Sequence, residues 1–299
     1  MENLEQRLAR IRDDREHGSR WLVREAISLL HDLATEETLP AHEREQQVRK
    51  AAQALAHARP AMAALAVAMG RILSAQDGLA GIAREASRLL ETYDQAVERI
   101  TAYARPLLRG TLMTHSLSGT VLGVLSACSA QIERIIVLEG RPRYEGRDVA
   151  RALAQHGIAI TLLTDAQADI FLPQCHAVVV GADSVLANGD VLNKAGTALL
   201  AWAAHGHHVP FYVLCETLKI SPRPWSGDLS QLEEKEPEEV LEQPIAGVTA
   251  RNFYFDHTPA KLVTSIITEQ GLMSRQEVKQ MAIRALHDEQ ALNRMRKES

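Results

Sequence analysis

The stretch Val178–Thr197, VVVGADSVLANGDVLNKAGT, decides the fold of this chain. Its apolar opening run ends in the letters GAD, the letters NGD predict a tight turn, and the letters NKAGT lead into an apolar helix. In open parallel sheets, ligands bind just beyond the carboxyl ends of the strands. The pattern therefore predicts a polar site at such an end, formed by the carboxylate of Asp183, the amide of Asn193 and the ammonium of Lys194.

Lys194 begins the predicted helix Lys194–His205. The first N–H groups of a helix and its dipole favour anions, so we expect a phosphate contact at Lys194. Asp183 taken alone is also consistent with the cap of a turn. The amide and the ammonium at the end of the same connection favour the ligand-binding interpretation.

Short β-rich runs alternate with helical segments after about residue 110. Strands are expected at Thr111–Met113, Ile135–Leu138, Ile158–Leu163, Ala177–Val180 and Phe211–Leu214, and helices at Ser118–Ala130, Gly146–His156 and Lys194–His205. This alternation implies parallel crossovers and a buried sheet. Residues 226–244 predict a polar loop or excursion, and residues 259–269 and 274–295 predict helices.

The residues before the first predicted strand show helical spacing, as in Leu22, Ala26 and Leu29, and no convincing β pattern. The sequence therefore predicts an α/β chain with a helical domain at residues 1–108 and a parallel-sheet domain at residues 109–299.

The composition narrows the class of protein. The net charge of −5, from 33 basic and 38 acidic residues, argues against nucleic-acid binding through overall charge. Three cysteines without a C-x-x-C pair argue against a disulfide framework or a structural zinc site, and we expect no metal and no cofactor. The first residues are too charged for a secretory signal, and no run of about 18 apolar residues predicts a membrane span. We expect a cytoplasmic protein.

Polar residues also follow the first predicted strand. His115, Ser116 and Ser118 lie between that strand and a helix, where hydroxyl and backbone N–H groups suit a phosphate or a carboxylate. A serine at such a junction is also an ordinary helix cap, and the two roles are compatible.

The segment EGRPRYEGR follows the second predicted strand, and its Arg141 and Arg143 can clamp a phosphate in bidentate fashion. A solvated charged loop is the alternative. Glu216 and Lys219 follow the strand Phe211–Leu214 and are expected at the same rim of the sheet.

The chain resembles the family that contains methylthioribose-1-phosphate isomerase, ribose-1,5-bisphosphate isomerase and the regulatory subunits of translation initiation factor 2B. The matching pieces are THSLSGTV, EGRPRYEGR, VVVGADSVLANGDVLNKAGT, FYVLCETLKISP and FDHTPAKLVTSIITEQG. Gly18-Ser19 and Arg59-Pro60 resemble amino-terminal family positions. The resemblance implies a helical amino-terminal domain, a Rossmann-like carboxyl-terminal domain and a homodimer or higher homo-oligomer.

The resemblance also implies site roles. Asp183 matches the aspartate that carries proton transfer in the isomerases, and Asn193 and Lys194 match substrate-contacting positions. Where the isomerase pattern T-H-C-x-S has its cysteine, this chain has Ser116. A thiol has a pKa near 8.5 that is readily tuned, whereas a serine hydroxyl is a far weaker acid and needs an adjacent base. Proton transfer through Ser116 alone should be much slower.

Two functions follow from this sequence. The first is a sugar-phosphate isomerase that converts an aldose 1-phosphate to a ketose phosphate, closest to the ribose-1,5-bisphosphate type. The second is a non-catalytic protein like initiation factor 2B, which binds a sugar phosphate or a nucleotide as a regulatory ligand. Both use one site, in which Asp183 and Ser116 occupy the catalytic positions and these residues bind the ligand: Gly18, Ser19, Arg59, His115, Ser118, Arg141, Arg143, Asn193, Lys194, Glu216 and Lys219.

Overall fold

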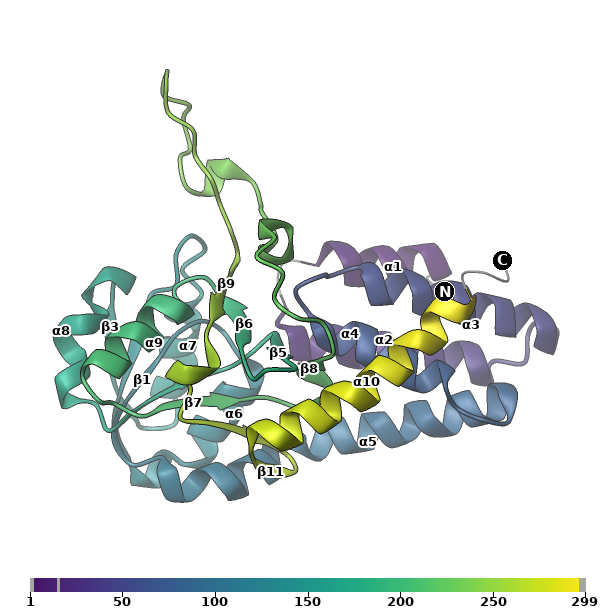
Figure 1. Ribbon diagram of the computed structural model, residues 1–299, viewed down its shortest axis with the longest axis horizontal. Helices are drawn as coiled ribbons and strands as arrows, with labels where there is room; N and C mark the ends of the chain where they lie inside the picture. The colour runs from purple at the N-terminus through teal and green to yellow at the C-terminus, as the bar shows by residue number, and fades with distance from the viewer. Residues whose placement is uncertain (1–2, 15–16, 296–299) are drawn as a thin grey trace.

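The computed structural model describes residues 3–14 and 17–295, with a helical region beside a sheet-containing region (Figure 1). The helices before the first strand are α1 (Leu4–Asp13), α2 (Ser19–Thr35), α3 (Ala41–His57), α4 (Ala63–Leu73) and α5 (Gly78–Ala104). They pack around an apolar core, to which α2 contributes Leu22, Ala26 and Leu29 at helical spacing. The predicted helical start of the chain is confirmed.

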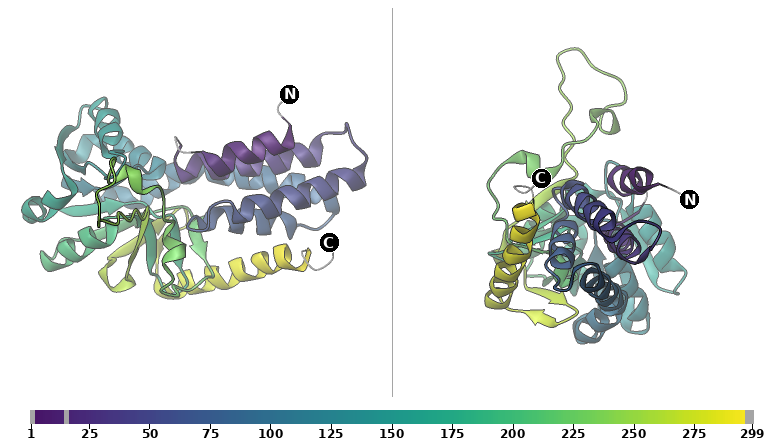
Figure 2. Two further views of the ribbon diagram at one scale, coloured as in Figure 1. Left: turned by 90° about the horizontal axis from the view of Figure 1, so that it is seen from above. Right: turned by 90° about the vertical axis from the view of Figure 1, so that its right-hand side faces the viewer.

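The last helix, α10 (Arg275–Met295), returns to the helical region and packs against α4. Gly70 on α4 allows this close approach, because a Cβ there would lie 2.5 Å from the carbonyl oxygen of Asp288. Figure 2 shows α10 running beside the other helices. The end of the chain therefore joins the two regions.

A seven-stranded sheet forms the other region, with the order β11-β10-β7-β4-β1-β2-β3. Its strands are β1 (Gly110–Thr114), β2 (Ile132–Leu138), β3 (Ala159–Leu163), β4 (Ala177–Val180), β7 (Phe211–Leu214), β10 (Ser265–Thr268) and β11 (Gly271–Met273). Neighbouring strands are parallel except for β10 and β11. The expected Rossmann-like parallel sheet is confirmed.

Helices cover both faces of this sheet: α6 (Gly119–Ala127), α7 (Gly146–Ala154), α8 (Ala168–Phe171) and α9 (Thr197–Gly206). Val178 and Val180 of β4 join the core under α8 and α9, whereas Ala177 and Val179 join the core under α5, α6 and α7. Successive side chains of a strand point to opposite faces, so a wholly apolar strand requires helices on both sides.

The strand order reverses between β1 and β4. The chain runs from β1 to β2 and β3 in one direction, and then returns to place β4, β7 and β10 on the other side of β1. Loops at the carboxyl ends of such neighbouring strands separate and leave a crevice for a ligand. Ser116 follows β1 and Asp183 follows β4, so both lie at this crevice.

A second, four-stranded sheet has the order β8-β5-β6-β9. Its strands are β5 (Ser184–Leu186), β6 (Val191–Lys194), β8 (Ile220–Ser221) and β9 (Phe255–Thr258). The predicted NGD turn is confirmed, because it joins β5 to β6. The predicted helix start at Lys194 is wrong: Asn193 and Lys194 pair with β9, and α9 begins only at Thr197.

The prediction of a helix at residues 259–269 is also wrong. The segment holds a short 3₁₀ turn, η8 (Ala260–Leu262), followed by the buried strand β10. β10 pairs with β7 in the main sheet through the run SIIT. Branched side chains favour a strand buried on both faces, and this preference outweighs the helical spacing of the segment.

Residues 222–254 form a long excursion between β8 and β9, which rises away from the rest of the chain (Figure 1). The two limbs of the excursion meet in a bridge between Glu234 and Phe253. The predicted excursion is thus confirmed. Within residues 3–14 and 17–295, no helix is both long enough and apolar enough to cross a membrane.

Candidate functional site

A cavity of about 630 Å³ lies where the helical region meets the carboxyl ends of β1 and β4. Its walls come from α1, the start of α2, the loops after β1, β2 and β4, strand β6 and the two limbs of the excursion. It is lined by Arg12, Asp13, Asp14, His17, Gly18, Ser19, Leu22, Arg59, Met62, Ser116, Leu117, Arg143, Glu145, Asp148, Asp183, Lys194, Glu233, Lys235, Glu236, Tyr254 and Phe255. The lining is more polar than apolar and contains charges of both signs.

Ser116 lies in the wall formed by the loop after β1. Its backbone has φ of 70°, which is in the left-handed region and is uncommon for a residue with a side chain. The hydroxyl of Ser116 donates to Oε2 of Glu145 at 2.9 Å, and the backbone N–H of Leu117 donates to the same oxygen at 3.0 Å. The unusual backbone conformation thus directs two donors at one carboxylate.

Glu145 stands directly before α7 and receives a third contact, from Lys194. The ammonium of Lys194 lies 2.6 Å from Oε1 of Glu145 and 4.2 Å from the centre of the Tyr254 ring. Burial raises the pKa of Glu145, but the Lys194 ammonium and the two hydrogen bonds just described outweigh it, so this pKa lies below its ordinary value. Glu145 is therefore a carboxylate at neutral pH.

Asp183 lies in the wall formed by the loop after β4. The hydroxyl of Ser19 donates to its carboxylate, and the ammonium of Lys219 donates to the Ser19 oxygen at 3.0 Å. Burial raises the pKa of Asp183 above its ordinary value, and the charge of Lys219 and the hydrogen bond from Ser19 offset this only in part. Asp183 therefore holds a proton more readily than an exposed aspartate.

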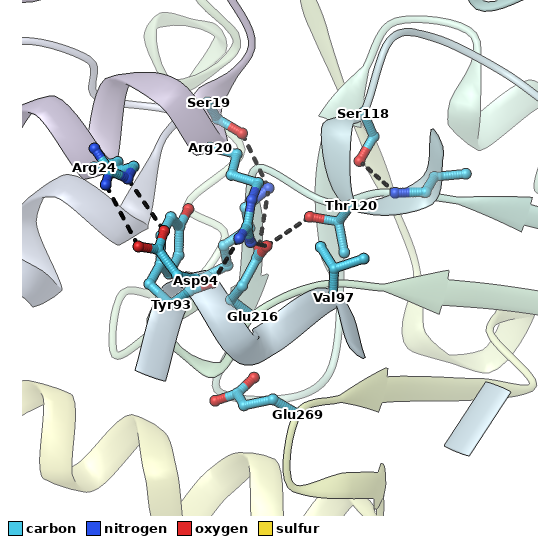
Figure 3. Close-up of polar contacts among 12 residues, drawn as sticks. Ser19, Arg20, Arg24, Tyr93, Asp94, Val97, Ser118, Thr120, Glu216 and Glu269 are labelled. Atoms are coloured by element: carbon cyan, nitrogen blue, oxygen red, sulfur yellow. Dashed lines mark hydrogen bonds and ion pairs between the residues drawn. The ribbon is translucent and has the colours of Figure 1, made fainter. Parts of the chain in front are cut away.

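Glu216 and Lys219 lie behind the cavity wall and not in it. Figure 3 shows Arg20 and Thr120 meeting at the Glu216 carboxylate. This carboxylate lies 2.8 Å from the Arg20 guanidinium and 2.6 Å from the Thr120 hydroxyl. Burial raises the pKa of Glu216, but Lys219, Thr120 and Arg20 together hold it below its ordinary value. The buried Glu216 carboxylate thus holds the start of α2 against the sheet through Arg20, and it helps to place Lys219 behind Ser19.

Asn193 also lies outside the lining. Its amide donates to the hydroxyl of Thr197 at 3.0 Å, at the start of α9. The N–H groups of Gly196 and Ala198 donate to a carboxylate oxygen of Asp256 at 2.7 and 3.0 Å. The start of α9, where we expected a phosphate, is therefore occupied by a carboxylate of the chain itself.

His115 and Ser118 likewise have partners within the fold. A ring nitrogen of His115 lies 2.9 Å from the carbonyl oxygen of Ala195, and burial lowers the pKa of this histidine. Ser118 caps α6 by accepting from the N–H of Val121 at 3.3 Å. The capping alternative thus describes what Ser118 does in this structure.

The two arginines of EGRPRYEGR separate. Arg143 lines the cavity, whereas the exposed Arg141 contacts the hydroxyl of Tyr144 at 2.9 Å and lies outside the lining. A joint clamp on one phosphate by both guanidinium groups stays a prediction.

The amino-terminal positions Gly18, Ser19 and Arg59 all line the cavity. Gly18 is the N-cap of α2, and within the described part of the chain no side chain caps the first N–H groups of this helix. Arg59 donates to the carbonyl oxygen of Asp14. An uncapped helix start beside a guanidinium is a ready binding site for an anion.

Glu145 is not among the site residues that the sequence predicts. The segment EGRPRYEGR predicts a phosphate clamp through its arginines and gives its second glutamate no role. Ser116 is the signal that could have indicated Glu145, because a weakly acidic hydroxyl that transfers a proton needs a base beside it.

The fold and the cavity together define an α/β protein with a charged cavity at the reversal of its strand order. The model of the initiation factor 2 subunit family matches residues 15–275. The chain therefore belongs to this family.

The relatives include enzymes. A ribose 1,5-bisphosphate isomerase from Archaeoglobus fulgidus is 32% identical over 282 residues, which cover 91% of this chain and 90% of that protein. A methylthioribose-1-phosphate isomerase from Anaeromyxobacter sp. is 39% identical over 251 residues, which cover 77% of this chain and 74% of that protein.

The fold is also shared with a translation factor. The crystal structure of the Pyrococcus horikoshii translation initiation factor eIF-2B aligns with a TM-score of 0.79 and 31% identity, covering 91% of this chain and 97% of that one. This chain is thus similar both to sugar-phosphate isomerases and to initiation-factor proteins.

Proposed function

We propose that this chain binds a phosphorylated sugar in the cavity and converts an aldose 1-phosphate to a ketose phosphate, with ribose 1,5-bisphosphate as the first substrate to test. The observation that carries the proposal is the meeting of Asp183 and Ser116 in one cavity that Arg59, Arg143 and Lys194 also line. The similarity to isomerases named for ribose 1,5-bisphosphate and methylthioribose 1-phosphate supports it.

One phosphate binds at the start of α2, next to Gly18 and Arg59. Backbone N–H groups and a guanidinium there supply donors at the positive end of a helix. Lys194 and Arg143 supply a second cationic region of the same cavity. A sugar with phosphates at both ends fits two such regions, with its reacting carbons between them.

The reaction moves two protons. The hydrogen on C2 must arrive on C1, and the proton of the 2-hydroxyl must arrive on the ring oxygen as the C1–O bond breaks. The raised pKa of Asp183 suits the proton exchange between oxygens, because the acid must be protonated when the ring opens. Ser116 occupies the position of the thiol of the family isomerases.

Incubation with ribose 1,5-bisphosphate or methylthioribose 1-phosphate, followed by NMR, tests the proposal. The expected result is a ketose product from one of them. The Asp183→Asn variant should lose activity by at least about 100-fold, since a positioned acid contributes that much. Asp94→Asn, at an exposed pair with Arg24, is the matched control and should retain activity. Failure of concentrated enzyme to form product from either sugar would reject the isomerase.

The serine at position 116 favours a second candidate, a non-catalytic protein that holds a sugar phosphate or a nucleotide as a regulatory ligand. In that case these ligands raise the melting temperature without turnover. The Ser116→Cys variant separates the two candidates. Turnover by Ser116→Cys but not by the natural chain would identify a scaffold that has lost its reaction, whereas turnover by both supports the enzyme.

We further propose that the chain forms a homodimer or a higher homo-oligomer. Exposed apolar side chains on the excursion support this, because Val240, Ile245 and Val248 are each about half exposed, at 45, 55 and 54%. Light scattering coupled to size-exclusion chromatography gives the mass in solution, and a mass near 33.0 kDa would contradict the proposal.

A further inference from the structure

Besides Asp183, the cavity wall contains the carboxylate of Glu145, which lies beside Ser116. Glu145 is directed at the space beside Ser116 by three donors: the Ser116 hydroxyl at 2.9 Å, the Leu117 N–H at 3.0 Å and the Lys194 ammonium at 2.6 Å. A side chain held by three contacts in a partly buried wall has one orientation. Such preorganisation is what proton transfer to and from carbon demands.

The direction of one hydrogen bond separates the roles of Ser116 and Glu145. The Ser116 hydroxyl donates to Glu145, so its proton already points at the carboxylate and its oxygen is not a base. Removing that proton would create an alkoxide beside a carboxylate, which is costly in a buried site. The carboxylate, in contrast, is ionised and keeps acceptor positions for another proton.

We propose that the Glu145 carboxylate is the catalytic base that moves the carbon-bound proton, with the Ser116 hydroxyl as its positioning donor. This inference rests on the isomerase activity proposed above. The cavity then holds two carboxyl groups with separate tasks, Glu145 for the proton on carbon and Asp183 for the protons on oxygen. The lowered pKa of Glu145 keeps it ionised and able to accept a proton, and the raised pKa of Asp183 favours its protonated form.

The proton balance closes with these two groups. The Glu145 carboxylate takes the hydrogen on C2 as a proton, and the released electron pair forms the C1=C2 bond as the bond from C1 to the ring oxygen breaks. Asp183 gives its proton to that oxygen. The 2-hydroxyl then returns a proton to Asp183 while C2=O forms, and C1 takes the proton from Glu145. Both carboxyl groups end as they began, and no oxidant or reductant enters.

Lys194 remains compatible with this role. Its ammonium has three donors, so it can hold Glu145 and still contact an oxygen of the substrate. The cavity wall also carries the cationic Arg143 and Lys235 and the acidic Asp148, and the charge of Glu145 acts on His115 and on Asp183. Burial raises the pKa of Glu145, and the charge of Lys194, which is in contact with it, is the largest influence that lowers it.

The test compares Glu145→Gln with the exposed control Glu133→Gln, using ribose 1,5-bisphosphate or methylthioribose 1-phosphate and the full chain. Glutamine keeps the shape of Glu145 but cannot take a proton. Glu145→Gln should lower kcat by about 10² to 10⁴-fold with little change in KM, because general acid–base catalysis contributes that factor. Ser116→Ala should lower kcat by only about 10-fold, as expected for one lost hydrogen bond.

The pH profile separates a catalytic Glu145 from a merely structural one. In the natural chain, kcat should fall at low pH as Glu145 becomes protonated. The double variant Ser116→Cys with Glu145→Gln should regain part of the lost activity, now with kcat rising near the pKa of a thiol, about 8.5. If Glu145 has only a structural role, the cysteine should not restore activity, and the pH profile of kcat should show no new rise near pH 8.5.

The outcomes distinguish this inference from the proposed function. An active natural chain whose Glu145→Gln variant keeps at least a third of kcat overturns the role of Glu145 and leaves the isomerase standing. An active natural chain with inactive Glu145→Gln and a rescued double variant supports both. Loss of activity in Glu145→Gln without rescue by cysteine counts against Glu145 as the base. A natural chain with no turnover of either sugar removes the proposed function and this inference with it.

Discussion

Two groups of side chains at or directly behind the cavity wall each contain a carboxylic acid, a serine and a lysine. Asp183, Ser19 and Lys219 lie at the end of β4, and Glu145, Ser116 and Lys194 lie near the end of β1. We name them the β4 group and the β1 group. The pKa of the carboxyl group is raised in the β4 group and lowered in the β1 group.

The position of the lysine explains this difference. In the β1 group, the ammonium lies 2.6 Å from the carboxylate of Glu145 and stabilises its charge directly. In the β4 group, the ammonium bonds the Ser19 hydroxyl and the carbonyl of Ala182, so burial dominates at Asp183. The same three kinds of side chain, a carboxylic acid, a serine and a lysine, thus favour the protonated carboxyl group in one wall and the ionised one in the other, according to which atom the lysine touches.

The largest expected effect comes from removing the lysine of the β4 group. Lys219 is 3% exposed and lies 3.9 Å from the fully buried Glu216. In Lys219→Met, Glu216 keeps Arg20 but loses this charge, so we expect the unfolding free energy to fall by about 3 kcal/mol. Denaturant unfolding measures it, and a loss below about 1 kcal/mol would show that the β4 group does not depend on this charge.

Removing the lysine of the β1 group should cost less, because Glu145 is partly exposed. Lys194→Met should lower the unfolding free energy at pH 7 by about 2 kcal/mol, as expected for a charged hydrogen bond. A lowered carboxyl pKa contributes stability at neutral pH that is lost as pH falls through the folded-state pKa. The difference between the two proteins should therefore shrink below about pH 4.

The same variant tests the catalytic reading of the β1 group. Without the Lys194 ammonium the pKa of Glu145 rises, so the low-pH decline of kcat should move to higher pH in Lys194→Met. If the low-pH decline of kcat stays at the same pH in this variant, a group other than Glu145 causes the decline.

The two arginines of EGRPRYEGR offer a matched pair. Arg143 lines the cavity and Arg141 does not, so Arg143→Ala should raise KM by about 10-fold, the value of a charged contact with a phosphate. Arg141→Ala should change KM by less than about twofold, as at an exposed charge. Equal effects of the two substitutions on steady-state KM would refute this assignment.

The smallest effect is expected from the serine of the β4 group. Ser19→Ala removes the donor that favours the Asp183 carboxylate, so the pKa of Asp183 rises further. Asp183 acts while protonated, and activity therefore falls as pH rises through this pKa. The high-pH decline of kcat should move upward by less than about one unit, with about 1 kcal/mol lost in stability.

The sequence predicted much of the sheet because its signals are local. β4 and β7 match the expected Ala177–Val180 and Phe211–Leu214, since short apolar runs between turn residues leave little choice of structure. Residues 259–269 were predicted wrongly because an apolar run with helical spacing is also compatible with a buried strand. Only the pairing of β10 with β7 decides between them.

The candidate site was also predictable in part, because some of its residues lie in segments with clear local signals. Asp183 and Ser116 could be placed at strand ends from their own segments, and Gly18, Ser19 and Arg59 from the family resemblance; all five line the cavity. Their catalytic and binding roles stay predictions. The sequence could not show that three predicted residues lie outside the cavity lining: Asn193, Ser118 and Arg141. Each of these side chains hydrogen-bonds another residue of the chain, and tertiary packing decides which residue that is.

The sequence by itself determined that Ser116 follows β1 and that Asp183 follows β4, because residue type and local pattern are written along the chain. The tertiary structure alone decided that Glu145 and Lys194 meet beside Ser116, since the reversal of strand order brings the loops after β1 and β2 together with β6. It also decided which carboxyl group is charged, because that depends on burial and on the distance to a lysine far away in the chain.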